Sequence, residues 1–243
     1  MKILIRGAGD IATGIALRLY RAGMQVVMTD LPAPTAIRRT VCFSQAIILG
    51  EMTVEDVTAR RAETPDQAEA LLAQGLIPVL ADPDCTCRTR LRPDALVDAI
   101  LAKRNLGTKM DDAPIVVGIG PGFTAGEDCH AVVETMRGHT LGRVIYEGSA
   151  LPNTNIPGLI GGYAGERVLR APADGIFHQK LEIGAVVRAG DVAGEVAGQP
   201  MRCTIDGVLR GILADGTPVF RGMKAGDVDP RCKPEYCTTA SDK

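Results

Sequence analysis

Two glycines near the start of the chain form the pattern with the clearest chemical meaning. Gly7 and Gly9 lie in the segment GAGDIA (7–12), which has the G-x-G-x-x-A spacing of a dinucleotide-binding loop. In such a loop the first glycine allows a tight turn, and the second lets the backbone approach a phosphate at a helix N-terminus. Asp30 ends the next apolar segment, about 20 residues beyond the loop, where an acid that binds ribose belongs. These residues predict a site for an anionic, nucleotide-like ligand.

Asp10 argues against ordinary dinucleotide chemistry at this loop. It stands at the start of a helix predicted from the spacing of Ile11, Ile15 and Leu19, where a pyrophosphate would sit. An acid at that position gains from the helix dipole, but it repels a diphosphate unless a metal or a basic group intervenes. We therefore expect an anionic ligand here and keep NAD(P)-dependent hydride transfer as an alternative.

A pair of cysteines is the candidate for catalysis. Cys85 and Cys87 follow a predicted buried strand (77–81), and Arg88 and Arg90 come directly after them. Neighbouring arginines lower the pKa of a thiol and favour the nucleophilic thiolate. We expect both thiols to be accessible to solvent and at least one to be ionised; the alternative is that they are incidental loop cysteines. The cysteine spacing is not that of a zinc site, and no metal is predicted.

Two further segments are candidates for ligand binding, and each has a structural alternative. Residues 95–101 (ALVDAIL) form a strand or a helix. If they form a strand, Lys103 and Asn105 lie just past its carboxyl end, where ligands bind in open α/β sheets. The turn with Gly120 and Gly122 is either a hairpin that needs glycines or a second cradle for an anion. The segment that follows this turn adds two candidate contacts, Glu134 and Arg137.

The elements that would position these residues alternate between strand and helix. Apolar strands are predicted at 2–6, 25–29 and 77–81, and helices after residue 10 and over 65–74. The predicted fold class is therefore α/β, with a Rossmann-like dinucleotide-binding domain over residues 1–110. Residues 111–165 are expected to form a connecting β-rich region that carries the second glycine turn.

The last third of the chain contains one segment twice. Residues 169–196 and 201–228 align without a gap at a shift of 32 residues, and each copy has short apolar strands between glycine turns. This pattern resembles the biotinyl/lipoyl, or barrel-sandwich hybrid, fold, which implies a small all-β domain over 166–231 followed by a polar tail over 232–243. The joint between the copies (197–201) has no lysine, so we expect no covalent biotin or lipoate.

Composition limits the classes of function. The formal net charge of −2 provides no field that attracts nucleic acid, and no apolar run is long enough to cross a membrane. Seven cysteines without a disulfide pattern, and a start directly in a strand, favour the cytoplasm. The sequence leaves open whether the chain forms a homo-oligomer.

Several segments together resemble YqeB-type accessory proteins of selenium-dependent molybdenum hydroxylases. They include IRGAGDIATG (5–14), VDAILAKRNLGT (97–108), VGIGPGFTAGEDCHAVVETMRGH (117–139), LGRVIYEGSALPNTNIPG (141–158) and GMKAGDVDPR (222–231). These proteins are distantly similar to the maturation factors that load sulfur onto the molybdenum cofactor of xanthine dehydrogenases. The resemblance implies binding of the molybdenum cofactor or a related nucleotide, assistance in selenium or sulfur insertion, and a hydroxylase apoprotein and other maturation factors as partners.

Two other classes of function stay open beside this one. A nicotinamide-dependent oxidoreductase would bind NAD(P) and need a general acid, for which the chain offers three histidines. A non-catalytic docking module would bind no small ligand. The sequence leaves undecided whether the chain is an enzyme.

Overall fold

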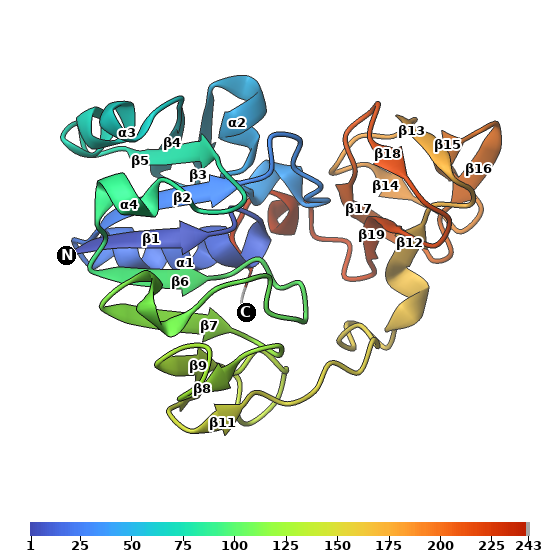
Figure 1. The fold of residues 1–243 in the computed structure, drawn as a ribbon. Helices are drawn as coiled ribbons and strands as arrows, with labels where there is room; N and C mark the ends of the chain where they lie inside the picture. The colour runs from blue at the N-terminus through green and yellow to red at the C-terminus, as the bar shows by residue number, and fades with distance from the viewer. Residues whose placement is uncertain (242–243) are drawn as a thin grey trace. The chain divides into compact units, whose positions relative to one another are not determined.

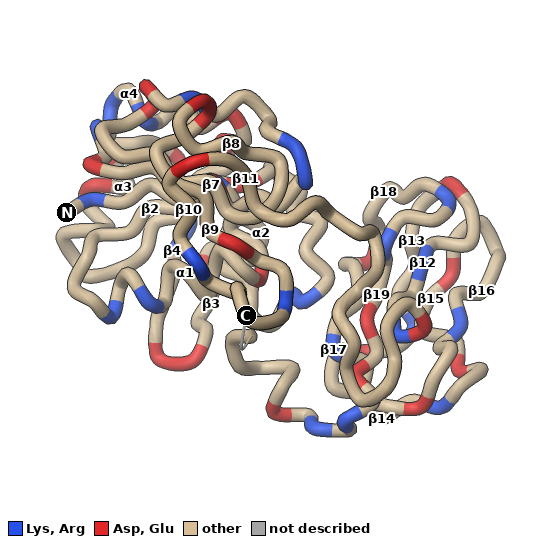
Figure 2. Tube along the Cα trace, turned by 90° about the horizontal axis from the view of Figure 1, so that it is seen from below, with Lys and Arg blue, Asp and Glu red and all other residues tan. Residues whose placement is uncertain are grey.

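The computed structural model describes residues 1–241, which divide into two compact units (Figure 1). The sheet unit consists of residues 1–34, 42–154 and 240–241. The β unit consists of residues 35–41 and 155–239. Lys and Arg alternate with Asp and Glu along both units, without a long stretch of one sign (Figure 2). No helix in the described part of the chain is long and apolar enough to cross a membrane.

A nine-stranded mixed sheet forms the centre of the sheet unit. Its strands from edge to edge are β10 (Val144–Ile145), β9 (Ala131–Val133), β7 (Ile115–Ile119), β6 (Ala95–Asp98), β1 (Lys2–Arg6), β2 (Gln25–Asp30), β5 (Ile77–Ala81), β4 (Val57–Ala62) and β3 (Glu51–Val54). Adjacent strands from β9 to β4 are parallel, and the edge strands β10 and β3 are antiparallel to their neighbours. A separate pair is formed by β8 (Thr124–Ala125) and β11 (Gly148–Ser149).

Four α-helices occur within residues 1–241, and only one exceeds eight residues. They are α1 (Asp10–Arg21), α2 (Gln45–Leu49), α3 (Pro65–Leu72) and α4 (Arg88–Leu91). The longest, α1, buries Ala12, Ala16 and Leu17, a spacing that places them on one face. The start of α3 is set by Thr64, whose Oγ1 accepts a hydrogen bond from the backbone N–H of Gln67 at 3.2 Å.

The predicted fold class, a Rossmann-like domain plus a small all-β domain, is wrong. The structure is built mostly from strands around one large mixed sheet, and a doubly wound domain needs helices on both faces of its sheet. Between β6 and β7 the chain forms only the short 3-10 helix η2 (Met110–Asp112), and between β7 and β9 it forms β8. The β unit is not the C-terminal repeat alone, since residues 35–41 belong to it. The strand–helix–strand pattern of residues 2–30 does not continue beyond β6.

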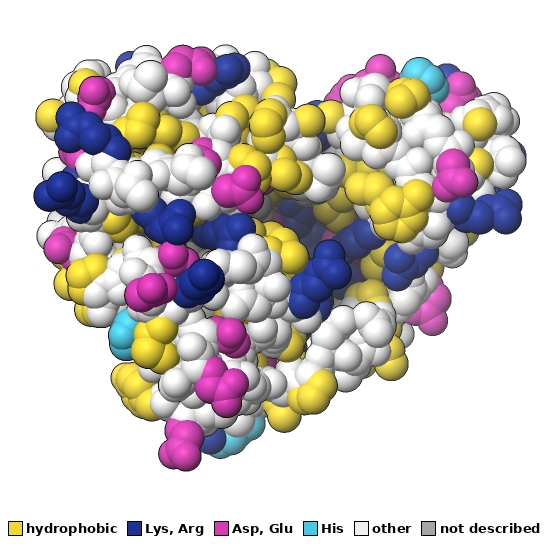
Figure 3. All heavy atoms as spheres, viewed as in Figure 1, with side chains coloured by type: hydrophobic (Ala, Val, Ile, Leu, Met, Phe, Trp, Pro, Cys, Tyr) yellow, Lys and Arg dark blue, Asp and Glu magenta, His cyan; other side chains and the backbone are white. Residues whose placement is uncertain are grey.

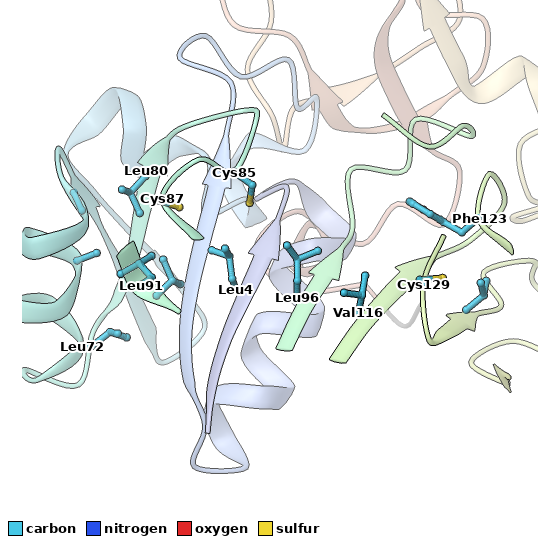
Figure 4. Close-up of a cluster of buried hydrophobic side chains, with 14 of the residues drawn as sticks. Leu4, Leu72, Leu80, Cys85, Cys87, Leu91, Leu96, Val116, Phe123 and Cys129 are labelled. Atoms are coloured by element: carbon cyan, nitrogen blue, oxygen red, sulfur yellow. The ribbon is translucent and has the colours of Figure 1, made fainter. Parts of the chain in front are cut away.

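Apolar side chains from the central strands form the core of the sheet unit. Leu4, Leu96 and Val116 come from three adjacent strands and are almost completely buried (Figure 4). The turn after β5 adds Cys85 and Cys87 to the same cluster. The core therefore extends from the strands into the loops at their carboxyl ends.

In the β unit the two copies of the repeat exchange strands. One sheet contains β12 (Val168–Arg170), β19 (Lys224–Asp229), β17 (Gly207–Ile212) and β14 (Val186–Val187). The other contains β16 (Gln199–Arg202), β15 (Val192–Val196), β13 (Gly175–Gln179) and β18 (Pro218–Val219). Each sheet thus takes two strands from each copy, so neither copy can complete a sheet by itself. Three short 3-10 helices, η1 (Arg39–Val41), η3 (Gly165–Arg167) and η4 (Pro234–Cys237), complete this unit.

Candidate functional site

The carboxyl ends of five adjacent parallel strands carry most of the predicted site residues. The chain runs from β1 to β2 and β5 on one side and then returns to place β6 and β7 on the other side of β1. In open α/β sheets, ligands bind where the strand order reverses in this way. We call the loops at this end the switch edge, which comprises residues 7–9, 30–31, 82–87, 99–105 and 120–122.

The first glycine loop has one glycine that the fold requires and one that it does not. Gly7 has a φ of +103°, and a Cβ there would lie 3.0 Å from the carbonyl oxygen of Ala99. Gly9 has an ordinary φ of −74°, and a Cβ there would meet nothing within 4 Å. The space beside Gly9 is therefore open to an approaching ligand, as the sequence predicts for the second glycine.

Asp30 shapes this loop from the end of β2. Its Oδ2 accepts a hydrogen bond from the backbone N–H of Ala8 at 2.8 Å, and its Oδ1 accepts one from Leu31 at 2.7 Å. Burial raises the pKa of the Asp30 carboxyl, and the two backbone hydrogen bonds only partly oppose this. Each carboxylate oxygen keeps a second lone pair that can accept a hydrogen bond from a ribose hydroxyl. The role with ribose therefore stays a prediction. Asp10 is the first residue of α1, beside the same loop.

The loop after β6 is packed tightly between the two glycine turns. Leu101 and Lys103 have left-handed backbones, with φ values of 60° and 64°. A Cβ on Gly122 would lie 2.6 Å from the backbone of Arg104, and one on Gly120 would lie 2.7 Å from Oγ1 of Thr135. Residues 95–98 form a strand, so Lys103 and Asn105 do follow a carboxyl end. The second glycine turn therefore holds the loop that carries these residues.

Lys103 and Arg104 are the two cations of this loop. Both side chains are exposed, and neither makes a hydrogen bond or an ion pair within residues 1–241. Solvent reaches the Lys103 ammonium, yet the surrounding loops desolvate it enough to lower its pKa. Basic side chains lie across the middle of the sheet unit on the face drawn in Figure 3. The loop thus presents two positive charges that no internal acid neutralises.

Two of the predicted ligand residues use their polar atoms inside the protein. Asn105 donates from Nδ2 to the Thr108 carbonyl and to Asp128 Oδ1, and its Oδ1 accepts from the backbone N–H groups of Gly107 and Thr108. Glu134 is buried, and its carboxylate accepts from the backbone N–H of Met136 at 2.6 Å and of Leu151 at 2.8 Å.

Both Asn105 and Glu134 therefore hold loops in place. Arg137 follows β9 and is exposed. Because β9 runs parallel to β7, Arg137 and Glu134 follow the same end of the sheet as the switch edge.

The two candidate thiols are buried, which corrects the expectation that solvent reaches them. Cys85 is 2% exposed and Cys87 is 5% exposed. The Asp82 carboxylate closes their turn by accepting from Cys87 N at 2.7 Å and from Thr86 Oγ1 at 3.0 Å. Cys85 Sγ lies 3.4 Å from Oγ1 of Thr29, a residue of β2 that the sequence analysis did not single out. Figure 4 shows Cys85 beyond the end of the central strands, with its sulfur directed toward them.

The two thiols differ in acidity because they are hydrogen-bonded to each other. The Cys87 thiol lowers the pKa of Cys85 despite burial, with further lowering by Thr29 and Arg6. The same hydrogen bond, together with burial and the Asp82 carboxylate, raises the pKa of Cys87. Arg88 and Arg90, which the sequence suggests as the cause, pair instead with Asp112 at 3.0 Å and Asp66 at 2.8 Å.

A buried cation, Arg6, lies behind the switch edge; the sequence suggests it as a ligand contact, but its donors are used inside the protein. Arg6 donates to Thr108 Oγ1 at 2.9 Å and lies 3.4 Å from Asp98 Oδ2, and Thr108 donates to the same Asp98 oxygen at 2.6 Å. Arg6 also donates to the carbonyl groups of Pro83 and Leu106. It thereby ties the cysteine turn to the loop after β6. The signal in the sequence is an arginine that directly follows the buried residues 3–5.

The opposite edge of the sheet carries an open depression of about 770 Å³. Its lining comes from residues 88–94 and 109–114, which precede β6 and β7. Arg88 and Asp112 in this lining already pair with each other. Among the described residues, no group of three or more His, Cys, Asp or Glu side chains is placed to hold a metal ion.

No protein-family model matches the chain, whereas a curated relative does. The relative is "Uncharacterized protein YqeB" of Escherichia coli (strain K12), which is 52% identical over 241 residues. The match covers 99% of this chain and 44% of that protein, so the chain spans less than half the length of its relative.

Solved structures give only distant likenesses. An aspartoacylase family protein from Mesorhizobium loti is 14% identical, with coverage of 61% of this chain and 60% of that chain and a TM-score of 0.26. The product-bound ectoine utilization protein EutE (DoeB) from Ruegeria pomeroyi is 13% identical, with coverage of 90% and 63% and a TM-score of 0.25. Likenesses at this level carry no argument about activity. The resemblance to YqeB is confirmed by sequence identity: nearly all of this chain is homologous to a part of this E. coli protein.

Proposed function

We propose that the chain is an accessory protein of a molybdenum hydroxylase. In this proposal it binds the molybdenum cofactor, or a related anionic nucleotide, as cargo at the switch edge. It then assists the insertion of selenium or sulfur into that cofactor. The apoprotein of the hydroxylase and other maturation factors are the proposed partners.

One observation carries the ligand-binding part of this proposal. The backbone at Gly9 is open, and Lys103 and Arg104 lie in a loop pinned at Gly7 on one side and at Gly122 on the other. An anionic ligand beside Gly9 would lie at the N-terminus of α1, where the helix dipole favours negative charge, and near two cations without internal partners. Arg6 is excluded as a ligand contact, because its donors are used inside the protein.

The residues present fit a phosphate-bearing group better than a neutral one. Lys103 and Arg104 can each form a charge-assisted hydrogen bond with a phosphate oxygen. The Asp30 carboxylate is already engaged with the loop backbone, because it accepts from the N–H groups of Ala8 and Leu31. The cargo would contribute the molybdenum that receives the chalcogen, while the chain's residues would bind and orient the cargo.

The cysteine turn supports the second part of the proposal. Cys85 lies beside Thr29, whose carbonyl oxygen accepts the hydrogen bond from Gly7 N at 2.8 Å. The thiol with the lowered pKa is therefore at the same end of the sheet as the open glycine. A thiolate in this position can accept a sulfur or selenium atom near a bound cofactor.

Lys103→Gln is expected to weaken binding of molybdenum cofactor released from a purified hydroxylase by about tenfold, which corresponds to about 1.4 kcal/mol for one lost charge-assisted hydrogen bond. Calorimetric titration of the full chain measures this. Lys109→Gln is the matched control, because Lys109 is exposed at the opposite edge of the sheet. Equal affinities of both variants and the parent would remove the ligand from the loop after β6.

A further inference from the structure

The turn after β5 holds two thiols in a fixed relation to each other. The Asp82 carboxylate binds Cys87 N and Thr86 Oγ1, and the Asp82 carbonyl accepts from Cys85 N at 3.1 Å. Cys85 keeps a left-handed backbone with a φ of 57°, a conformation that costs free energy for a residue with a Cβ. The thiols lie only one residue apart and are hydrogen-bonded to each other.

This pair differs from three other buried cysteines of the chain. Burial raises the pKa of the Cys129, Cys203 and Cys237 thiols, so these remain protonated. Cys85 is as buried as they are, yet its pKa is lowered because Cys87 and Thr29 stabilise the thiolate. The turn therefore contains a nucleophile, Cys85, and a proton-bearing thiol, Cys87, two residues further along the chain.

We propose that Cys85 and Cys87 form a two-thiol site whose substrate is a hydropersulfide. The Cys85 thiolate attacks the terminal sulfur of R–S–SH, a new S–S bond forms, and R–S⁻ leaves. Cys87 then attacks Cys85 Sγ of the Cys85–S–SH intermediate and gives its proton to the departing sulfur. The products are the Cys85–Cys87 disulfide and hydrogen sulfide.

Electrons and atoms balance in this sequence. The two thiols lose two electrons in total, and the transferred sulfur atom gains them as it becomes sulfide. The inference deepens the proposed function, because it assigns to the cysteine turn the step that provides a reduced chalcogen. A hydroperselenide would follow the same course with selenium in the terminal position.

Burial selects the class of substrate. Cys85 is 2% exposed and Cys87 is 5% exposed, so solvent has little access to either thiol. The terminal sulfur atom of a hydropersulfide carries only hydrogen, so it needs a smaller opening of the turn than a substituted sulfur atom does. Glutathione disulfide presents a substituent on both sulfur atoms, so its attack by Cys85 requires the whole turn to open. The site should therefore react with hydropersulfides much faster than with disulfides.

The test uses the full chain with Cys232→Ser, which removes the exposed cysteine. After addition of glutathione hydropersulfide, released sulfide and intact mass are measured. We expect one sulfide per chain and a mass lower by two hydrogen atoms. Cys87→Ser in this background should gain one sulfur atom on Cys85 and release no sulfide, and Cys85→Ser should do neither. Cys129→Ser, at another buried thiol, is the matched control and should behave as the parent.

Two results would overturn the inference. One is sulfide release by Cys85→Ser or Cys87→Ser at the parent's rate. The other is reaction of the parent with glutathione disulfide as fast as with the hydropersulfide, which would make the turn a general disulfide-exchange site. The cofactor titration with Lys103→Gln tests ligand binding separately, so a failed sulfide assay with intact cofactor binding removes the two-thiol inference alone.

Discussion

Gly122→Ala is expected to lower the free energy of unfolding by about 4 kcal/mol, the combined cost of overpacking and backbone strain. Gly122 has a φ of +111°, which disfavours any side chain, and the added Cβ would lie 2.6 Å from the Arg104 backbone. Backbone cannot move aside as a flexible side chain does, so the loop with Lys103 must shift. Urea denaturation of the full chain measures the loss.

Gly126→Ala separates the two causes of this effect. Gly126 belongs to the same turn region and has a φ of +92°, but a Cβ there would meet nothing within 4 Å. The free energy of unfolding of Gly126→Ala should therefore fall only by the cost of backbone strain, about 1–2 kcal/mol. If the free energy of unfolding fell equally in both variants, the close packing of Gly122 on Arg104 would not hold this loop.

Asp229→Asn is expected to destabilise the chain by about 3 kcal/mol or more, as for removal of one partner from a buried ion pair. Asp229 is 1% exposed and binds Arg231 at 2.7 Å, with Arg210 at 3.6 Å. Burial raises the pKa of the Asp229 carboxyl, but the hydrogen bonds and charges of the two arginines outweigh it and hold the pKa below its usual value. The ionised form is thus favoured in the folded state.

This shift gives the substitution a pH signature. A carboxyl whose pKa is lowered by folding stabilises the protein above its unfolded pKa of about 4, and this stabilisation is lost as the pH falls through the folded pKa. The parent should therefore lose stability below about pH 4 more steeply than Asp229→Asn in acid titrations followed by circular dichroism. Asp56→Asn, at an exposed carboxylate paired with Arg21, is the control and should change little. Parallel acid curves for the parent and Asp229→Asn would contradict this role.

Local patterns predicted individual elements well where residues within the element mark its ends. The expected strand over 77–81 is found as β5, and the expected helix from Pro65 is found as α3, because Thr64 and Pro65 mark its start. The fold class was wrong because the alternation at residues 2–30 and 65–81 was taken as a closed domain over residues 1–110, whereas the same sheet also takes β7, β9 and β10 from residues 115–145. There the glycine turns and short strands replace helices, and no periodic signal distinguishes a covering loop from a covering helix.

The candidate site was predictable only in part. Loops that follow parallel strands meet at one edge, so Gly9, Asp30, Cys85 and Lys103 could be assigned to the same end of the sheet. Side-chain roles depend on partners distant in sequence, which spacing does not reveal. Arg88 pairs with Asp112 rather than with the thiols, and Glu134 accepts a hydrogen bond from the backbone N–H of Leu151. The exchange of strands between the repeat copies is likewise invisible in their alignment.

The most direct test of the proposed site is the binding of released molybdenum cofactor by Gly9→Val, compared with Gly14→Val in one calorimetric titration. An added Cβ would meet nothing within 4 Å at either position, and neither glycine has a positive φ, so we expect both variants to fold. Gly14 lies within α1, whereas Gly9 faces the space assigned to the ligand. The proposed function predicts that Gly9→Val loses binding and that Gly14→Val keeps the parent's affinity. Undiminished binding by Gly9→Val would contradict it.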